Sequence, residues 1–305
     1  MTSRRYLHAP ALPQRSALIR SAALCVTLVG ACSADAGMRN AELDICRYEV
    51  AFADEFDDLS IASRELKGKR WTAHTPWNGD FGDAVFSNPR PDGRPFAVSD
   101  GKLRITAFRD EAGRWRSGLI AAGDASGAAH GVKYGYFEAR MRLPPGPGTW
   151  PAFWLMSPED PPGKSNPSIE IDVVEYYGHM TDRYVATWHV WYPKPEKEKT
   201  RSEGEKIRIP DQSLVGGFHT YGVRVEPQTM TFYLDRKPVW QAPTPPELKT
   251  PLYPLVNLAL GSGYSIENTP DPSVLEVDYV RVYRPRAPGK PGGCDQPSAS
   301  SDHAN

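Results

Sequence analysis

Three carboxylates, Glu170, Asp172 and Glu175, lie in the segment SIEIDVVE that begins at residue 168. Side chains on a β-strand point to alternate faces, so Glu170 and Asp172 share one face and the isoleucines beside them share the other. Glu175 reaches the acidic face only if one extra residue is inserted, and we therefore predict a β-bulge at Val173 and Val174. The three carboxylates are expected side by side on one surface.

A strand of this kind could also be a solvent-exposed face with no chemical role. Like charges crowded on one face repel each other, however, so the arrangement is costly without a use. The neighbours Tyr176, Tyr177, Trp188 and Trp191 are aromatic, whereas a solvated strand more often carries Lys, Ser or Thr. Two carboxyls that flank a sugar bond can cleave it, one as nucleophile and the other as general acid and base. The pattern therefore favours glycoside hydrolysis.

Short strands separated by turns must position these carboxylates. The chain of 305 residues has 30 Pro and 26 Gly and shows no long helical pattern. We expect residues 194–206 to be a charged, solvated excursion and residues 70–98 to contain a long functional loop. The pattern predicts an all-β fold, either an antiparallel β-sandwich or a jelly roll. Strands are expected at residues 50–56, 102–108, 118–120, 134–143, 150–156, 168–177, 184–191, 218–225, 229–234, 253–260 and 274–283.

The N-terminal segment is typical of an exported protein. A basic region through Arg20 precedes an apolar run at residues 21–29, which is too short to span a membrane and indicates an export signal. Residues 29–32 (VGAC) resemble a bacterial lipobox, so residues 1–31 are expected to be a lipoprotein-type signal peptide and Cys32 to carry lipid. The alternative is an ordinary signal with a chance cysteine. We expect an outer-membrane or periplasmic lipoprotein, or a secreted protein, because Ser33 after Cys32 points away from inner-membrane retention.

Removing residues 1–31 takes away four of the 36 basic residues and none of the 37 acidic residues, which leaves a net charge of −5. A nucleic-acid partner is not expected with this charge. Cys46 and Cys294 bracket the domain, and a disulfide between them would tie its ends together in an oxidising compartment, although two free thiols are the alternative. We expect residues 32–47 to be a linker, residues 48–284 the folded domain, and residues 285–305 a Pro/Gly-rich connector and disordered tail.

Five ordered segments resemble family-16 glycoside hydrolases, the group of laminarinases, lichenases, agarases and related endo-β-glycanases. They are residues 134–140 (YGYFEAR), 150–155 (WPAFWL), 170–175 (EIDVVE), 218–222 (FHTYG) and 277–283 (VDYVRVY). The resemblance covers about residues 52–283 and implies a jelly roll whose concave sheet carries a sugar-binding cleft, with no catalytic cofactor. The segment 74–83 (HTPWNGDFGD) looks most like bacterial members that trim exopolysaccharides.

The resemblance implies that Glu170 is the nucleophile and Glu175 the general acid and base, with Asp172 between them. A retaining mechanism needs the two carboxyls about 5–5.5 Å apart, which two long side chains on a bulged strand can reach. We expect the trio to titrate as a coupled set, with Glu175 protonated in the resting enzyme. The expected activity is that of a retaining endo-β-glycanase acting on a β-1,3 or β-1,3-1,4 glucan or a bacterial exopolysaccharide. A non-catalytic glycan-binding jelly roll and a transglycosylase using the same residues are the alternatives.

Aromatic faces stack on sugar rings, so exposed tryptophans and their polar neighbours are predicted to bind substrate. Some of the tryptophans must belong to the core instead: Trp150 is favoured for the cleft, and Trp154 is left open between cleft and interior. His189 has the parity to face Glu170 across neighbouring strands, although a place in the interior is equally compatible with the sequence. The predicted substrate-binding residues are Trp77, Asn78, Trp150, Trp154, Trp188, His189, Trp191 and Asn257.

The resemblance also implies one structural calcium ion on the convex side of the sandwich. The matching positions are the backbone carbonyls of Glu55 and Gly101 and the carboxylate of Asp278. Oxygen-only ligation suits this hard cation. The alternative is that Asp278 merely caps a sheet edge. The remaining expected partners are a β-linked polysaccharide and, through Cys32, a bacterial membrane, and the protein is expected to be a monomer.

Overall fold

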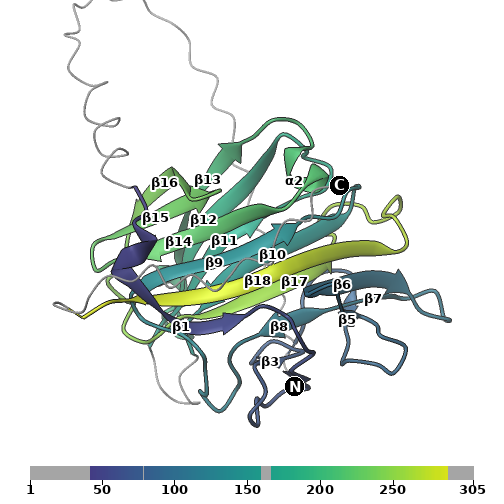
Figure 1. Cartoon of the computed structure of the whole chain (residues 1–305), viewed down its shortest axis with the longest axis horizontal. Helices are drawn as coiled ribbons and strands as arrows, with labels where there is room; N and C mark the ends of the chain where they lie inside the picture. The colour runs from purple at the N-terminus through teal and green to yellow at the C-terminus, as the bar shows by residue number, and fades with distance from the viewer. Residues whose placement is uncertain (1–41, 78, 159–165, 288–305) are drawn as a thin grey trace, which may run out of the picture.

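Two β-sheets packed face to face make up the protein in this computed structural model, which describes residues 42–77, 79–158 and 166–287 (Figure 1). The sheet that carries the carboxylates has eight strands in the order β13-β12-β11-β10-β17-β8-β3-β2. We call it the carboxylate sheet. Its strands are β2 (Ile61–Ala62), β3 (Trp71–Thr72), β8 (Leu119–Ala121), β10 (Thr149–Met156), β11 (Ser168–Glu175), β12 (Arg183–Trp191), β13 (Arg201–Arg208) and β17 (Tyr253–Leu260).

The second sheet has ten strands, eight of them in the order β16-β15-β14-β9-β18-β6-β7-β4, while β1 pairs with β18 and β5 with β6. We call it the supporting sheet. All pairs between named strands are antiparallel except β2 with β3 and β4 with β7. Its strands are β1 (Tyr48–Asp54), β4 (Val85–Phe86), β5 (Phe96–Ser99), β6 (Lys102–Arg109), β7 (Trp115–Ser117), β9 (Gly135–Arg142), β14 (His219–Val225), β15 (Thr229–Leu234), β16 (Lys237–Pro243) and β18 (Ser273–Pro285).

The jelly-roll sandwich predicted from the strand pattern is confirmed, and all eleven predicted strands are present. The prediction of a solvated excursion at residues 194–206 is wrong in its second half, because β13 begins at Arg201 and pairs along the edge strand β12. Strands β3 and β4 lie within the segment 70–98, and β5 begins within this segment, which was expected to contain a long loop; β2, β7 and β16 were not predicted either. The described helical elements are single turns, η1 (Ile45–Arg47), η2 (Lys197–Lys199) and α2 (Ser213–Gly216). Within the described residues, no helix is long and apolar enough to cross a bilayer.

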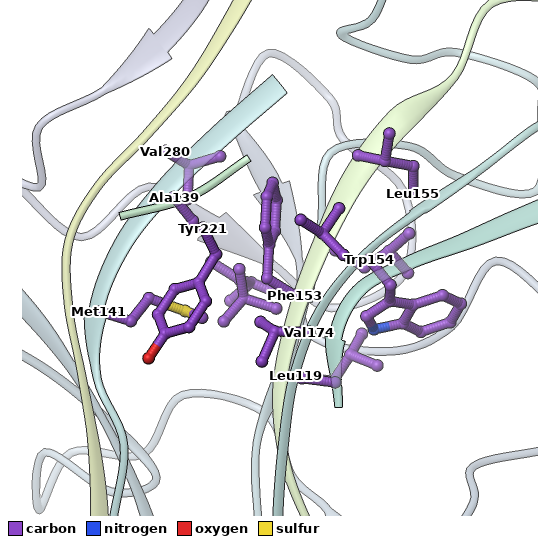
Figure 2. Packing of buried hydrophobic residues seen from close by; sticks show 14 of the residues in the cluster. Leu119, Ala139, Met141, Phe153, Trp154, Leu155, Val174, Tyr221 and Val280 are labelled. Carbon is purple, nitrogen blue, oxygen red and sulfur yellow. The ribbon is translucent and has the colours of Figure 1, made fainter. Parts of the chain in front are cut away.

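The core lies between the two sheets and explains the alternation in the sequence. Residues of β12 alternate strictly between half-buried and buried, because one face of this strand meets the supporting sheet and the other does not. All eight residues of β17 are buried, so both of its faces are covered. Figure 2 shows Phe153 and Val174 of the carboxylate sheet meeting Met141 and Tyr221 of the supporting sheet in this core. A tightly packed interior of this kind fixes the strand that carries the carboxylates.

The two ends of the described chain lie side by side on the supporting sheet. Leu43, Ile45 and Tyr48 pack against a cluster of buried tyrosines, so the end of the expected linker belongs to the folded unit. The backbone N–H of Arg286 donates to the carbonyl of Arg47 at 2.9 Å. The signal segment 1–31, the lipidation site Cys32, the binding residue Asn78, the disulfide partner Cys294 and the tail from residue 288 lie outside the described residues, so those assignments stay predictions.

Candidate active site

A bulge in β11 turns the third carboxylate onto the face of the first two. Against β10, Glu175 pairs with Ala152, Val174 with Phe153 and Asp172 with Trp154, so Val173 is the extra residue. The same irregularity lies between Asp172 and Glu175 in the pairing with β12. Both valines are buried. The predicted bulge is therefore present, and all three carboxylates lie on one surface of the carboxylate sheet, which we call the carboxylate face.

Each glutamate accepts hydrogen bonds from aromatic side chains. The indole N–H of Trp191 donates to Oε2 of Glu170 at 3.0 Å. The indole N–H of Trp150 donates to Oε1 of Glu175 at 3.1 Å, and the hydroxyl of Tyr177 donates to the same oxygen at 3.4 Å. Rings of limited freedom therefore hold both carboxylates, and each glutamate keeps one oxygen free of these donors.

His189 lies opposite Glu170 on β12, as its parity predicted. Its Nε2 atom is 3.2 Å from Oδ2 of Asp172 and 3.9 Å from Oε1 of Glu170. The imidazole stacks on Trp191 with ring centroids 4.9 Å apart and planes inclined by 13°. The buried Oδ2 atom of Asp172 has no other partner in the described structure. His189 is thus placed to bridge Asp172 and Glu170.

Burial raises the pKa of all three carboxyl groups, to about 8 for Glu170, about 7 for Asp172 and about 8 for Glu175. Desolvation is the largest cause for each of them, because it disfavours the charged form. The charge of Asp172 raises the pKa of both glutamates further, whereas His189 lowers it. The trio therefore does not carry three charges at neutral pH and holds at least one proton, which a general acid requires.

Trp150 and Trp154 share the carboxylate face, but they differ in exposure. Trp150 is half-buried beside Glu175, whereas Trp154 is only 4% exposed. Trp77 and Phe81 cover Trp154 with ring centroids 6.0 and 5.9 Å away. The prediction that Trp154 contacts substrate is therefore corrected: it lies on the expected face as a support, while Trp77 and Trp150 remain half-buried candidates.

Asn257 is fully buried beneath these tryptophans and cannot reach substrate, contrary to the prediction. Its Oδ1 atom accepts a hydrogen bond from the indole N–H of Trp154 at 2.8 Å. Its Nδ2 atom donates to the backbone carbonyl of Trp150 at 3.3 Å. A buried amide needs such partners, and here both of them hold β10 in position.

Trp188 is another correction. It precedes His189 on β12 and is only 6% exposed, because its side chain packs in the core. Its parity is opposite to that of His189 and Trp191, so it points to the supporting sheet. The sequence showed the two faces of β12, but the prediction took tryptophans from both of them. Trp191, half-buried and bound to Glu170, is the tryptophan of this strand on the carboxylate face.

Two residues near the trio were not predicted as site residues. Tyr177 binds Glu175 and stacks almost parallel to Trp150, with centroids 6.2 Å apart and planes inclined by 12°. Phe81 contacts Trp150 edge-on at 5.4 Å. Tyr177 could have been found from its position two residues after Glu175, which gives it the same parity. Phe81 lies in a loop, where no periodicity signals its direction.

The residues implied for calcium supply oxygen atoms, but their carboxylate is already paired. The guanidinium of Arg140 lies 2.6 Å from Oδ2 of Asp278. A cation bound at Asp278 would have to compete with this positive charge. Glu55, which would contribute its carbonyl, uses its side chain to bind Arg281 at 2.8 Å. The carboxylate of Asp278 is thus engaged by Arg140, and calcium stays a prediction.

Comparison with known proteins agrees with the sandwich fold. Residues 48–285 match the family model described as "Beta-porphyranase A-D, GH16 domain". The chain belongs to glycoside hydrolase family 16. This family-16 chain is 31% identical over 263 residues to endo-1,3-1,4-beta-glycanase ExsH of Rhizobium meliloti (strain 1021), with 79% of this chain and 53% of ExsH covered. It therefore spans about half the length of that relative.

A second relative is the beta-glucanase of Rhodothermus marinus, 28% identical over 296 residues, which covers 90% of this chain and 98% of that protein. Among solved structures, the catalytic domain of an endo-1,3-beta-glucanase (laminarinase) from Thermotoga petrophila RKU-1 matches with a TM-score of 0.61 and 22% identity, covering 79% of this chain and 99% of that domain. This likeness confirms the fold of the family-16 chain.

Proposed function

We propose that the protein is a retaining endo-β-glycanase that cleaves its polysaccharide by double displacement. The observation that carries this proposal is the bulge at Val173, which brings Glu170, Asp172 and Glu175 onto one face. A glycan-binding protein without catalysis has no need of three carboxylates whose mutual repulsion must be overcome. The intact trio therefore favours an enzyme over a non-catalytic glycan-binding jelly roll.

The hydrogen bonds support a distinct role for each glutamate. Both donors to Glu175 bind Oε1, so Oε2 is the oxygen free to carry a proton toward the glycosidic oxygen. Trp191 binds Oε2 of Glu170, which leaves Oε1 to attack the anomeric carbon. The leaving sugar takes the proton of Glu175, and a covalent glycosyl ester forms on Glu170. Glu175 then removes a proton from water, which attacks the anomeric carbon and releases Glu170.

Asp172 and His189 are proposed to set the number of protons that the glutamates share. A charged Asp172 raises the pKa of both glutamates, and so favours a protonated Glu175 before the first step. Once His189 donates to Asp172, the repulsion on Glu170 falls and its attacking carboxylate is stabilised. A transglycosylase would use the same residues and would differ only in whether water or a sugar accepts the glycosyl group.

We propose a β-1,3-1,4-linked glycan as substrate, supported by the names of the Rhizobium meliloti relatives, which are both endo-1,3-1,4-beta-glycanases. Porphyran is the second candidate, supported by the description of the matching family model. Reducing-end release from lichenan, laminarin, porphyran, agarose and bacterial exopolysaccharides separates them. Cleavage of porphyran alone would overturn the first assignment.

The mechanism is tested by following the first product with proton NMR before it mutarotates. We expect the β anomer from a β-linked substrate, because a glycosyl intermediate on Glu170 inverts the configuration twice. Glu170→Gln should abolish turnover while the protein still folds and binds the glycan, and Asp172→Asn should cost less. An initial α anomer, or a Glu170→Gln variant with near wild-type turnover, would contradict the proposed roles.

We also propose that the protein is exported and lipidated on Cys32, which rests on the sequence of residues 1–32 alone. Palmitate labelling in a bacterial host should mark the wild-type chain and not a Cys32→Ser variant. Equal labelling of the two would show that Cys32 is not the modified residue. Recovery of both unlabelled in the medium would favour the ordinary export signal.

A further inference from the structure

Tyr264 differs from every other aromatic side chain in the described part of the protein. It is 42% exposed, whereas each of the other described Phe, Tyr and Trp residues is buried or half-buried. It lies in the loop that follows β17, close to the end of β11 that carries Glu175. The ring of this tyrosine exposes a large apolar face to solvent beside the proposed cleavage site, and such a face is available to bind a ligand.

A continuous series of rings connects Tyr264 with the acid and base. Its ring lies 4.1 Å from the imidazole of His179 and 5.4 Å from the ring of Tyr177, measured between centroids. Tyr177 in turn stacks on Trp150 at 6.2 Å. We call these four residues the aromatic ledge. It begins at Glu175, whose Oε1 atom accepts the hydrogen bonds of Trp150 and Tyr177, and it ends at the exposed face of Tyr264.

The loops that carry the ledge are held tightly. Residues 261–263 all have positive φ, at 89°, 54° and 84°, which turns the chain sharply before Tyr264. The N–H of Gly178 donates to the carbonyl of Thr149 at 3.0 Å. A Cβ atom at Gly178 would lie 1.9 Å from the carbonyl oxygen of Gly146, so only glycine allows this approach. The turn that carries Tyr264 is tied by two backbone hydrogen bonds, from the N–H of Gly261 to the carbonyl of Gly148 at 2.9 Å and from the N–H of Tyr264 to the carbonyl of Gly261 at 3.1 Å.

We propose that the aromatic ledge is a stacking subsite for one pyranose ring of the substrate on the leaving-group side of the cleaved bond. The assignment rests on the proposed function, because it takes Glu175 as the general acid. That acid delivers its proton to the glycosidic oxygen, so side chains gathered around Glu175 lie nearest the departing sugar. The apolar face of a sugar ring fits an aromatic face, and the hydroxyl and imidazole groups at the rim can bind the ring hydroxyls.

The test compares Tyr264→Ala with Tyr264→Phe on the panel glycan that the wild type cleaves fastest. Tyr264→Ala should lower kcat/KM by about three- to tenfold, the range expected for loss of one ring contact. Tyr264→Phe keeps the ring and should stay within about twofold of the wild type, since one peripheral hydrogen bond contributes little at an exposed site. Leu59→Ala, which truncates an exposed apolar residue after β1, is the matched control and should have no effect.

The side of the bond is tested by the ratio of transfer products to hydrolysis products at high substrate concentration. Transfer requires a sugar acceptor on the leaving-group side, so Tyr264→Ala should lower this ratio as well. A lower kcat/KM with an unchanged ratio would overturn the placement, and an unchanged kcat/KM would overturn the subsite.

Affinity electrophoresis in the same glycan, with Glu170→Gln as the background, keeps the two proposals separate. Weaker retention of the Glu170→Gln, Tyr264→Ala double variant supports the ledge independently of turnover. Hydrolysis by the wild type with equal retention of both variants contradicts the ledge alone. A wild type that neither cleaves nor binds any panel glycan contradicts the proposed function, and the ledge with it.

Discussion

Trp191 stabilises the ionised form of Glu170 through the hydrogen bond to Oε2. Trp191→Phe removes this donor and keeps an aromatic ring, so the pKa of Glu170 should rise further. Glu170 is the proposed nucleophile and would have to be ionised to attack, so the acid limb of the profile of kcat/KM against pH should move to higher pH. We expect a shift of about 0.5–1 pH unit, the effect of about 1 kcal/mol for one hydrogen bond.

The matched control for this prediction is Trp188→Phe, which alters a tryptophan of the same strand on its interior face. It should lower the free energy of unfolding and leave the acid limb in place. A Trp191→Phe variant whose acid limb coincides with that of the wild type would show that the indole does not tune Glu170.

Parity along the strands predicted much of the site at residue scale. It placed Glu170, Asp172 and His189 together, because alternation is strict wherever a single strand face is buried. It could not separate Trp154 and Asn257 from the exposed residues of the same face. Their burial depends on the loop that carries Trp77 and Phe81, and the direction of a loop is not periodic.

At the scale of elements, the bulge predicts an unusual tolerance of β11 to deletion. Without Val173 the segment reads Glu170-Ile171-Asp172-Val174-Glu175, which still alternates, so Glu175 stays on the carboxylate face. This single deletion should therefore keep measurable turnover. Deleting Val173 and Val174 together places Glu175 next to Asp172 and turns it into the core.

The double deletion should lower kcat by about 10²- to 10⁴-fold, the usual contribution of a general acid and base, and should also lower the melting temperature. Initial rates and thermal unfolding of both variants check this. Equal loss of activity in the two variants, with the single variant fully folded, would show that the bulge itself rather than the face of Glu175 is required.

Long strands with a buried apolar face were predictable from the sequence, and most short strands and the edge strands β13 and β16 were not. Strand β13 has one buried residue, Ile207, among its eight residues and carries charges on both faces. It forms because β12 offers an unpaired edge, which is a property of the sheet. Strand β16 contains two prolines, and such a pattern argues against a central strand. It occupies the end of the supporting sheet, where proline is tolerated.

At the scale of the whole molecule, the carboxylate trio makes the free energy of unfolding depend on pH. The pKa values of these groups are raised in the folded state, so between about pH 4 and pH 8 the folded chain binds more protons than the unfolded chain. The contribution of the trio to the free energy of unfolding is therefore fully present below pH 4, and it is lost as the pH rises to about 8. Asp110 and Glu247, whose pKa values are lowered to about 2, act in the opposite direction and only at lower pH.

Asp172→Asn removes one of these costly ionisations. The variant should be about 1–3 kcal/mol more stable than the wild type at pH 8 and no more stable at pH 4. Denaturant unfolding at the two pH values measures the difference, with Asp100→Asn at an exposed turn as the control. A stabilisation of equal size at both pH values would contradict an electrostatic origin.

The predicted disulfide between Cys46 and Cys294 would connect the two ends of the folded domain. The hydrogen bond between Arg286 and Arg47 brings Arg286 close to Cys46, which is next to Arg47 in sequence. Arg286 lies eight residues before Cys294. A bridge closing so long a loop should stabilise the protein by about 4–5 kcal/mol in the chain-entropy model. Mass spectrometry of a non-reduced digest should recover the linked peptides. Recovery of Cys46 and Cys294 as free thiols in exported protein would refute the pairing.

The exposed strand β13 has a consequence for how a polymer meets the enzyme. Residues 201–206 are all exposed, so no other part of the described structure covers β13 at this edge of the carboxylate face. A long chain can be laid onto such a surface sideways, and an encounter does not require a chain end to be threaded. After the cut, the two halves can separate by lateral diffusion, so successive cuts should fall on unrelated chains. The viscosity of the polymer solution should then drop long before sugar release is extensive.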